Sequence, residues 1–232
     1  MDELELFGAP RAWLWLVLGG TALAVPTLLR GFVRRGKGSR HEKRFWLQRA
    51  PQLAAGANLF LVSAAFEAIE FVLGTGEPAF AKATFSTFRQ QLPLLSLALI
   101  LPAFLAGVIS WAGVVVSALG ISLLVWGWLS LGSMFSPDAE IISGHQLRQS
   151  GPYRFVLHPV YSGLVILLLG SAVTALSPLS TLITIGLVAP LFLRRAKYEE
   201  ALLEQEFGEA YREYAQRLRW RRFVPTFVSF GR

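Results

Sequence analysis

Two short stretches in the C-terminal half of this chain bring together side chains that could do chemistry. In residues 144–163, a Gly-Pro turn at 151–152 is followed by His158 and Pro159. Proline suits the first turn of a helix because its missing N–H would have no helical partner there, so His158 is expected at a helix N-terminus. The positive end of the helix dipole favours a neutral imidazole and leaves backbone donors for a carboxylate. Tyr161 follows about one turn later on the same face.

The second stretch, residues 194–200, carries Arg195 and Glu199 one helical turn apart. Two apolar segments, 159–176 and 178–195, separate the stretches, and only a short turn containing Ser-Pro joins them. Two helices joined in this way form a tight hairpin. We therefore expect both stretches to meet at one membrane surface.

A plainer interpretation of these residues stays open. His158 and Tyr161 would then be polar anchors at the membrane interface. Arg195 would be a positive-inside anchor, and Glu199 would be its local ion-pair partner.

Other common chemistries find little support in the residue types. There is no cysteine, which excludes thiolate metal sites and cysteine nucleophiles, and the three histidines lack the spacing of metal ligands, so we expect no metal. Residues 74–79 fit a loose dinucleotide-binding pattern but follow an apolar segment rather than a strand. The basic residues that give the net charge of +7 lie beside apolar segments and accompany no recognition motif. We therefore expect no nucleic-acid partner.

The composition points to a lipid bilayer as the surroundings of the chain. Apolar residues make up 53% of it and charged residues 16%, and the mean hydropathy is +0.49. The apolar runs are continuous rather than alternating, which predicts helices, each needing roughly 20 residues to cross about 30 Å of hydrocarbon. We predict an all-α polytopic membrane bundle of five or six spans, from the candidates 11–30, 52–74, 92–110, 112–132, 159–176 and 178–195.

Two basic clusters indicate the orientation of the chain. The first lies within residues 30–49 and the second within 194–232, and the positive-inside rule places both in the cytosol. An odd number of crossings would then separate the tail from an N-terminus on the outside, so one of the six candidates should not cross. The weakest are 52–74, which contains two glutamates, and 92–110, which a proline divides.

An apolar stripe follows the last candidate span. Its members recur at helical spacing and predict an amphipathic cytosolic helix over about 197–219. The stripe consists of Leu203, Phe207, Tyr211, Tyr214 and Leu218. Such a stripe ordinarily serves packing rather than cofactor binding.

Taken together, these motifs resemble the isoprenylcysteine carboxyl methyltransferase family. The resemblance is carried by Gly144-His145-x-Leu147, Gly151-Pro152-Tyr153-Arg154-x-x-x-His158-Pro159-x-Tyr161, Arg195-x-x-x-Glu199-Glu200, Leu203, Phe207-Gly208, Tyr211, Tyr214 and Arg222-x-x-Pro225. It covers roughly residues 112–226, and Phe135-Ser136 resembles the segment before this core. We accordingly divide the chain into 1–110, with N-terminal spans and a basic cytosolic loop, and 111–232, with the catalytic core.

The resemblance implies a cytosolic site for S-adenosyl-L-methionine between the loop before the hairpin and the C-terminal helix. Arg195 matches the position associated with the acceptor, and Arg154 is a second candidate catalytic residue. The family often has a cation before the His-Pro pair, whereas this chain has Leu157, a departure that removes any contact made by that cation. The implied cofactor contacts are His145, Gln146, Leu147, Arg148, Tyr153, His158, Pro159, Val160, Tyr161 and Glu199.

The expected function is that of an integral membrane methyltransferase acting on a hydrophobic or membrane-associated acceptor, such as an isoprenylcysteine-like carboxylate. In methyl transfer from a sulfonium, charge largely cancels, so alignment and exclusion of water supply most of the help. A carboxylate acceptor needs no general base, and a cation such as Arg195 would orient it. Three alternatives stay open: a phospholipid, amine or thiol methyltransferase, an NADPH-dependent membrane reductase of the sterol-reductase-like type, and an inactive membrane interaction protein.

Overall fold

The part of the chain that the structure describes folds almost entirely into helices. The structure, a computed structural model, describes residues 10–16, 18, 29, 33, 40–41, 49–73, 96–136, 138, 140–141 and 146–218, with only the backbone described at 40–41, 67–73, 99 and 140–141. Within this part, the extended pairing is limited to β1 (Arg40–His41) against β2 (Glu140–Ile141). The prediction of an all-helical chain is therefore confirmed for the part that the structure describes.

Two compact units make up the chain, and each gathers stretches that are distant in sequence. The first unit consists of Met1–Gly19, Leu53–Ile121 and Val165–Val188. The second unit consists of Gly20–Gln52, Ser122–Leu164 and Ala189–Arg232. The predicted division at residue 110 follows the extent of the motifs along the sequence, whereas these units follow contacts in space. That division stays a prediction.

In the first unit, a buried amide connects α4 (Ala50–Leu73) to the hairpin partner α9 (Pro178–Ile183) and the π-helix η6 (Thr184–Val188) that follows it. Asn58 is fully buried. Its Nδ2 donates to Thr184 Oγ1 at 2.5 Å, and its Oδ1 accepts from Ser180 Oγ at 2.7 Å. A buried polar group is tolerated when it is hydrogen-bonded in this way.

The predicted turn of the hairpin is confirmed between α8 (Pro159–Thr174) and α9. Ser177 caps α9 by accepting from Ser180 N at 3.3 Å, and Pro178 opens that helix. The short 3-10 helix η3 (Leu97–Leu99) supports the turn, because Leu97 N donates to Leu176 O at 2.7 Å.

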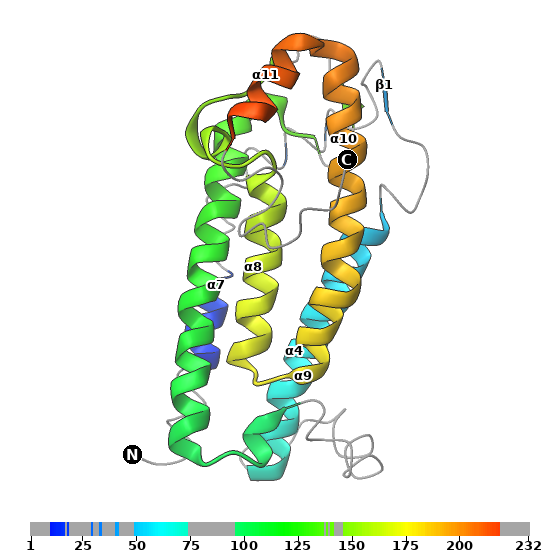
Figure 1. The fold of residues 1–232 in the computed structure, drawn as a ribbon. Helices are drawn as coiled ribbons and strands as arrows, with labels where there is room; N and C mark the ends of the chain where they lie inside the picture. Colours follow the sequence, from blue (N-terminus) through cyan, green and yellow to red (C-terminus); the bar gives the residue numbers. More distant parts are fainter. Residues whose placement is uncertain are drawn as a thin grey trace. The chain divides into compact units, whose positions relative to one another are not determined.

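The predicted break between spans 92–110 and 112–132 is wrong. One uninterrupted helix, α7 (Ala103–Leu131), runs across it (Figure 1). Pro102 precedes this helix and starts it rather than dividing it, since its carbonyl accepts from Ala106 N at 3.0 Å. Gly113 continues the helix and serves the packing against α8.

Glycines let α7 and α8 approach each other closely in the first unit. A Cβ on Gly113 would lie 2.3 Å from Thr174 N, and one on Gly170 would lie 2.4 Å from Ser117 N. Ser110 Oγ adds a hydrogen bond to Thr174 O at 2.9 Å. Small residues at such crossings allow the backbone contact that holds helices together in lipid.

The second unit contains the C-terminal end of α7, the 3-10 helices η4 (Gly132–Met134) and η5 (Gly151–Arg154), and the start of α8. It also contains α10 (Ala189–Phe207) and α11 (Glu209–Arg217), which turns away from α10 at Gly208 (Figure 1). The single helix predicted over 197–219 is therefore wrong in its continuity. Gly208 has φ +55° and ψ −123°, a positive-φ conformation that glycine adopts readily and that interrupts the helix.

The members of the apolar stripe still pack together, although Gly208 interrupts the helix between them. The buried members of this cluster are Leu157, Tyr211, Tyr214 and Leu218. Leu147, Leu203, Phe207 and Ala215 pack against them. The stripe therefore serves packing, as such stripes ordinarily do.

Among the residues that the structure describes, two helical stretches are long and apolar enough to cross a membrane, Ala103–Met134 and Pro178–Phe207. Ala50–Phe66 and Pro159–Thr174 are shorter apolar helices. Most of the candidate span 11–30 lies outside the described residues, as do the side chains of the two glutamates in 52–74. The count of five or six spans stays a prediction.

The glycine packing predicts a strong effect of one added methyl group. Gly170→Ala should lower the free energy of unfolding by about 1–3 kcal/mol, because the new Cβ meets backbone that cannot move aside. Denaturant unfolding of the detergent-solubilised chain measures this. Gly56→Ala is the matched control, since no atom lies within 4 Å of its Cβ position and alanine favours a helix. Equal stability of the two variants would contradict the close crossing.

Candidate functional site

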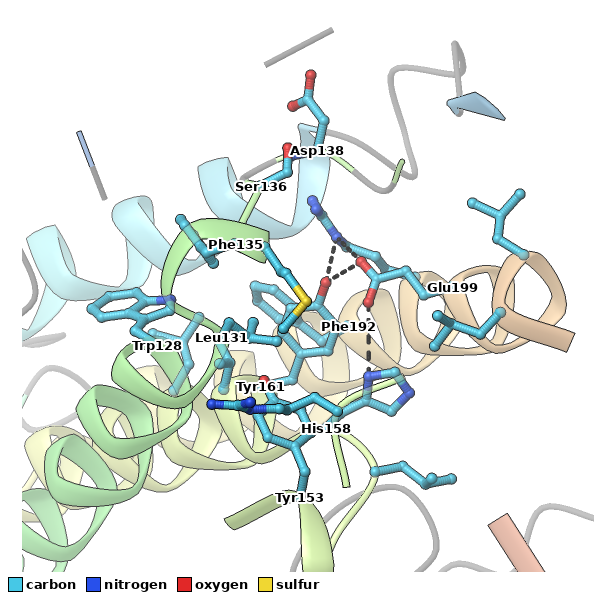
Figure 2. Close-up of a pocket in the computed structure, with 18 of the residues that line it drawn as sticks. Trp128, Leu131, Phe135, Ser136, Asp138, Tyr153, His158, Tyr161, Phe192 and Glu199 are labelled. Atoms are coloured by element: carbon cyan, nitrogen blue, oxygen red, sulfur yellow. Dashed lines mark hydrogen bonds and ion pairs between the residues drawn. The ribbon is translucent and has the colours of Figure 1, made fainter. Parts of the chain in front are cut away.

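A cavity of about 420 Å³ lies in the second unit, within the usual range of about 300–1,000 Å³ for small-molecule sites. The end of α7, the loop after it, the start of α8 and α10 all contribute to its wall (Figure 2). Tyr211 and Tyr214 of α11 line it as well. Its lining residues are Gln52, Leu124, Trp128, Leu131, Met134, Phe135, Ser136, Asp138, Leu147, Arg148, Tyr153, Leu157, His158, Val160, Tyr161, Leu164, Phe192, Arg195, Glu199, Leu202, Leu203, Tyr211 and Tyr214.

Four polar side chains form a connected group at this cavity, named here the polar cluster: His158, Tyr161, Arg195 and Glu199. Arg195 Nε donates to Tyr161 OH at 2.7 Å and to Glu199 Oε1 at 3.1 Å. Tyr161 OH in turn donates to Glu199 Oε1. The other carboxylate oxygen, Oε2, lies 3.7 Å from His158 Nδ1 (Figure 2).

Local helix geometry explains why the sequence produces this group. Pro159 is the first residue of α8, and the carbonyl of His158 accepts from Ser162 N at 2.9 Å, so His158 sits at the N-terminal boundary of the helix. Tyr161 follows within the first turn. Arg195 and Glu199 lie one turn apart on α10, where an ion pair of this spacing forms readily.

His158 and Tyr161 are further fixed by their neighbours. His158 Nε2 lies 3.3 Å from Glu200 Oε1, so the imidazole stands between two carboxylates. Its ring stacks on the ring of Tyr161 with centroids 5.5 Å apart and planes at 11°. Phe192 meets the Tyr161 ring from α10 at 5.1 Å between centroids. These contacts pack both rings against neighbouring side chains at the cavity.

Burial makes the pairing of Arg195 essential. Arg195 is only 2% exposed, and His158 is 7% exposed. A charge removed from water in this way is tolerated when fixed acceptors compensate for the lost hydration. The hydroxyl of Tyr161 and the carboxylate of Glu199 supply these acceptors, so the polar cluster behaves as one unit.

Two tyrosines connect α11 to the loop before α8. Tyr214 OH donates to the backbone carbonyl of Tyr153 at 2.6 Å. Burial raises the pKa of both phenols above the ordinary value, and the nearby carboxylate of Glu199 raises that of Tyr153 further. Both side chains are therefore neutral hydrogen-bonding groups at every pH in which the protein would ordinarily be handled.

The remainder of the wall is mostly apolar and comes largely from α7 and the loop after it. Trp128 and Phe135 meet edge-on, with ring centroids 6.0 Å apart. The indole Nε1 of Trp128 is buried and has no hydrogen-bond partner within the described part of the chain. A buried donor without a partner costs about 1–3 kcal/mol, so this N–H is suited to a ligand acceptor. The cavity thus combines a polar side with an apolar side.

Most of the sequence-predicted site residues meet at this cavity. Those that line it are Leu147, Arg148, Tyr153, His158, Val160, Tyr161, Arg195 and Glu199.

Three other predicted residues, Gln146, Arg154 and Pro159, do not appear in its wall. Gln146 is exposed, and exposed Arg154 lies with its guanidinium 4.7 Å from the centroid of the Phe155 ring. Pro159 is buried and opens α8. His145 lies outside the described residues.

Sequence reasoning missed several residues of the site. Trp128, Asp138 and Gln52 line the cavity, and Glu200 contacts His158. Glu200 carried a usable signal, since it directly follows Glu199 in the motif. The other three come from distant segments with no spacing in common. Among the described residues, no group of three or more His, Asp or Glu side chains is arranged to hold a metal ion.

The link between α11 and the loop leads to a stability prediction. Tyr214→Phe should lower the free energy of unfolding by about 0.5–1.5 kcal/mol, because it removes the donor to a buried carbonyl. Denaturant unfolding in detergent measures the change. Arg217→Gln is the control, since it removes an exposed 2.8 Å ion pair with Glu213 on the same helix and should have the smaller effect. The opposite ranking would contradict the assigned role of Tyr214.

Comparisons with known proteins connect this cavity to a family. Residues 111–205 match the isoprenylcysteine carboxyl methyltransferase family. A protein of Oryza sativa subsp. indica, named probable protein-S-isoprenylcysteine O-methyltransferase, is 34% identical over 112 residues, which are 47% of this chain and 59% of that relative. Protein-S-isoprenylcysteine O-methyltransferase B of Arabidopsis thaliana is 27% identical over 191 residues, 74% of this chain and 91% of that relative. The chain thus spans 59% of the length of the rice relative that it matches.

Proposed function

From the premise that its core, residues 111–205, places the chain in an isoprenylcysteine carboxyl methyltransferase-like family, we propose that the chain is an integral membrane methyltransferase. The family match confirms the resemblance seen in the motifs. The observation that carries the proposal is the polar cluster beside an apolar wall in one cavity. An enzyme that joins a charged methyl donor to a lipid-like acceptor needs both kinds of surface.

The proposed methyl donor is S-adenosyl-L-methionine, and the donor set fits such a molecule. Glu199 could bind the ammonium group, Arg148 could bind the carboxylate, and the ring of Tyr153 could face the base. The unpartnered N–H of Trp128 could meet an acceptor atom. When bound, the donor supplies an electrophilic methyl group on a sulfonium.

In this proposal, Arg195 orients the carboxylate of the acceptor. Its Nε is occupied by Tyr161 and Glu199, which fixes the plane of the guanidinium. A planar guanidinium held in this way can present its Nη donors to a carboxylate. Alignment is the main help that methyl transfer needs, and the apolar side of the cavity excludes water from it.

The proposed acceptor is hydrophobic, in keeping with the isoprenylcysteine in the names of the relatives. Phe135, Leu124 and Leu131 supply apolar surface for it at the cavity. A carboxylate acceptor gives up no proton and so needs no general base, whereas an amine or thiol would. The carboxyl methyltransferase named in the family match favours the carboxylate over the phospholipid, amine and thiol alternatives.

We also propose that the chain crosses the membrane five times, with the site and the C-terminus in the cytosol. Because α7 covers two of the predicted spans, six candidates become five, the odd number that the two basic clusters require. The pairing of β1 with β2 supports this arrangement, since it joins the first basic cluster to the loop before α8.

Binding measurements test the cofactor assignment. Glu199→Gln should weaken binding of S-adenosylhomocysteine to the purified chain about 10- to 100-fold, which is the effect of losing one charged hydrogen-bond partner. Isothermal titration calorimetry in detergent measures the Kd, and Glu213→Gln, an exposed carboxylate on α11, is the matched control. A parent protein that binds NADPH but not S-adenosylhomocysteine would favour the reductase alternative and reject the methyltransferase.

The acceptor role of Arg195 predicts a separation of turnover from cofactor binding. Arg195→Lys keeps a charge but loses the planar donor set, so kcat/KM for a prenylcysteine acceptor should fall roughly 100-fold or more. The Kd for S-adenosylhomocysteine should change far less. Arg194→Lys, the exposed neighbour on α10, is the control. A larger loss in cofactor binding than in turnover would remove the proposed acceptor role.

A further inference from the structure

Part of the cavity wall comes from outside the region that matches the family. Gln52 lies in the first turn of α4 and lines the cavity together with Ser136 and Asp138. The family match begins only at residue 111. The first basic cluster therefore ends directly beside the site.

An ion pair joins this early segment to the loop after α7. Arg49 Nη1 donates to Asp138 Oδ1 at 2.8 Å, across 89 positions of sequence. The side chain of Asp138 is 11% exposed, and that of Arg49 is 36% exposed. The partial burial of Asp138 sets this contact apart from pairs that are fully exposed to screening by water.

Asp138 belongs to a connected piece of wall. Its backbone N–H donates to Ser136 Oγ at 3.2 Å. Phe135, one residue earlier, is 9% exposed and packs edge-on against Trp128. A displacement of Asp138 would therefore be felt by the residues that form this side of the cavity.

A second, independent contact joins the same two segments. β1 and β2 pair antiparallel, with Arg40 opposite Ile141 and His41 opposite Glu140, and β2 lies beside α10. The wall segment is thus bounded by η4 on one side and by this pairing on the other. Among the described residues between η4 and η5, β2 is the one regular element. The wall therefore owes its position mainly to the ion pair and to the strand pairing.

We propose that Arg49 is a positioning residue of the site: its ion pair with Asp138 holds the part of the wall formed by Phe135, Ser136 and Asp138. The segment around the start of α4, which lies outside residues 111–205, thereby holds part of a cavity wall that lies within them. The consequence for ligand binding rests on the proposed function. The role of Arg49 in positioning the wall is independent of the proposed function, because it concerns the protein without a ligand.

Hydrogen exchange and ligand binding test this proposal on the purified full chain. The variants are Arg49→Gln, Asp138→Asn and the double variant, with Arg217→Gln as control because its exposed ion pair has the same 2.8 Å length and lies outside the cavity wall. Amide exchange in a peptide covering residues 134–138 should accelerate about fivefold in each single variant and no further in the double variant. The Kd for S-adenosylhomocysteine should rise by a similar factor, again without addition, and the control should match the parent.

Each of the other outcomes overturns a definite part of the proposal. Unchanged exchange in Arg49→Gln, or faster exchange spread over the whole chain, would reject Arg49 as a positioning residue. A much larger loss of binding in Asp138→Asn than in Arg49→Gln, with effects that multiply, would mean that Asp138 acts on the ligand itself. If the parent does not bind S-adenosylhomocysteine, the proposed function fails, and the exchange comparison alone still decides the role of Arg49.

Discussion

A guanidinium that has been taken out of water needs fixed acceptors, and this requirement organises the second unit. Arg195 meets it with one phenol from α8 and one carboxylate from its own helix. The same carboxylate faces His158 at the N-terminal boundary of α8. The start of α8 and the middle of α10 are therefore held in one arrangement by a single charge, and the cavity takes its polar side from that arrangement.

The cavity is useful because its two sides differ. The polar cluster gathers at the start of α8 and on α10, whereas α7 and Phe135 contribute most of the aromatic and aliphatic surface. The methyl donor proposed for this site is hydrophilic and the acceptor is lipid-like. A pocket of one character would bind only one of them well, so the division of the wall matches the chemistry that it is proposed to support.

The sequence predicted those parts of the site that local helix geometry determines. His158 and Tyr161 follow from a proline that starts a helix, and Arg195 and Glu199 follow from the four-residue helical repeat. Arg49 and Asp138 could not be found in this way, because no local pattern relates two loops 89 positions apart.

The errors in helix boundaries also have physical causes. The break placed near residue 111 is absent because α7 starts after Pro102 and continues as one apolar helix to Leu131. The break at Gly208 was missed because the apolar stripe keeps its helical spacing across it.

The crossing of α7 and α8 limits how the first unit can move. Gly113 faces Thr174 and Gly170 faces Ser117, so the two backbones interlock at two points. Sliding one helix along the other by a single residue would drive side chains into main-chain atoms, which a close-packed interior does not accommodate. A piston-like displacement is therefore blocked in this unit, and tilting about the crossing point is the motion that the packing leaves available.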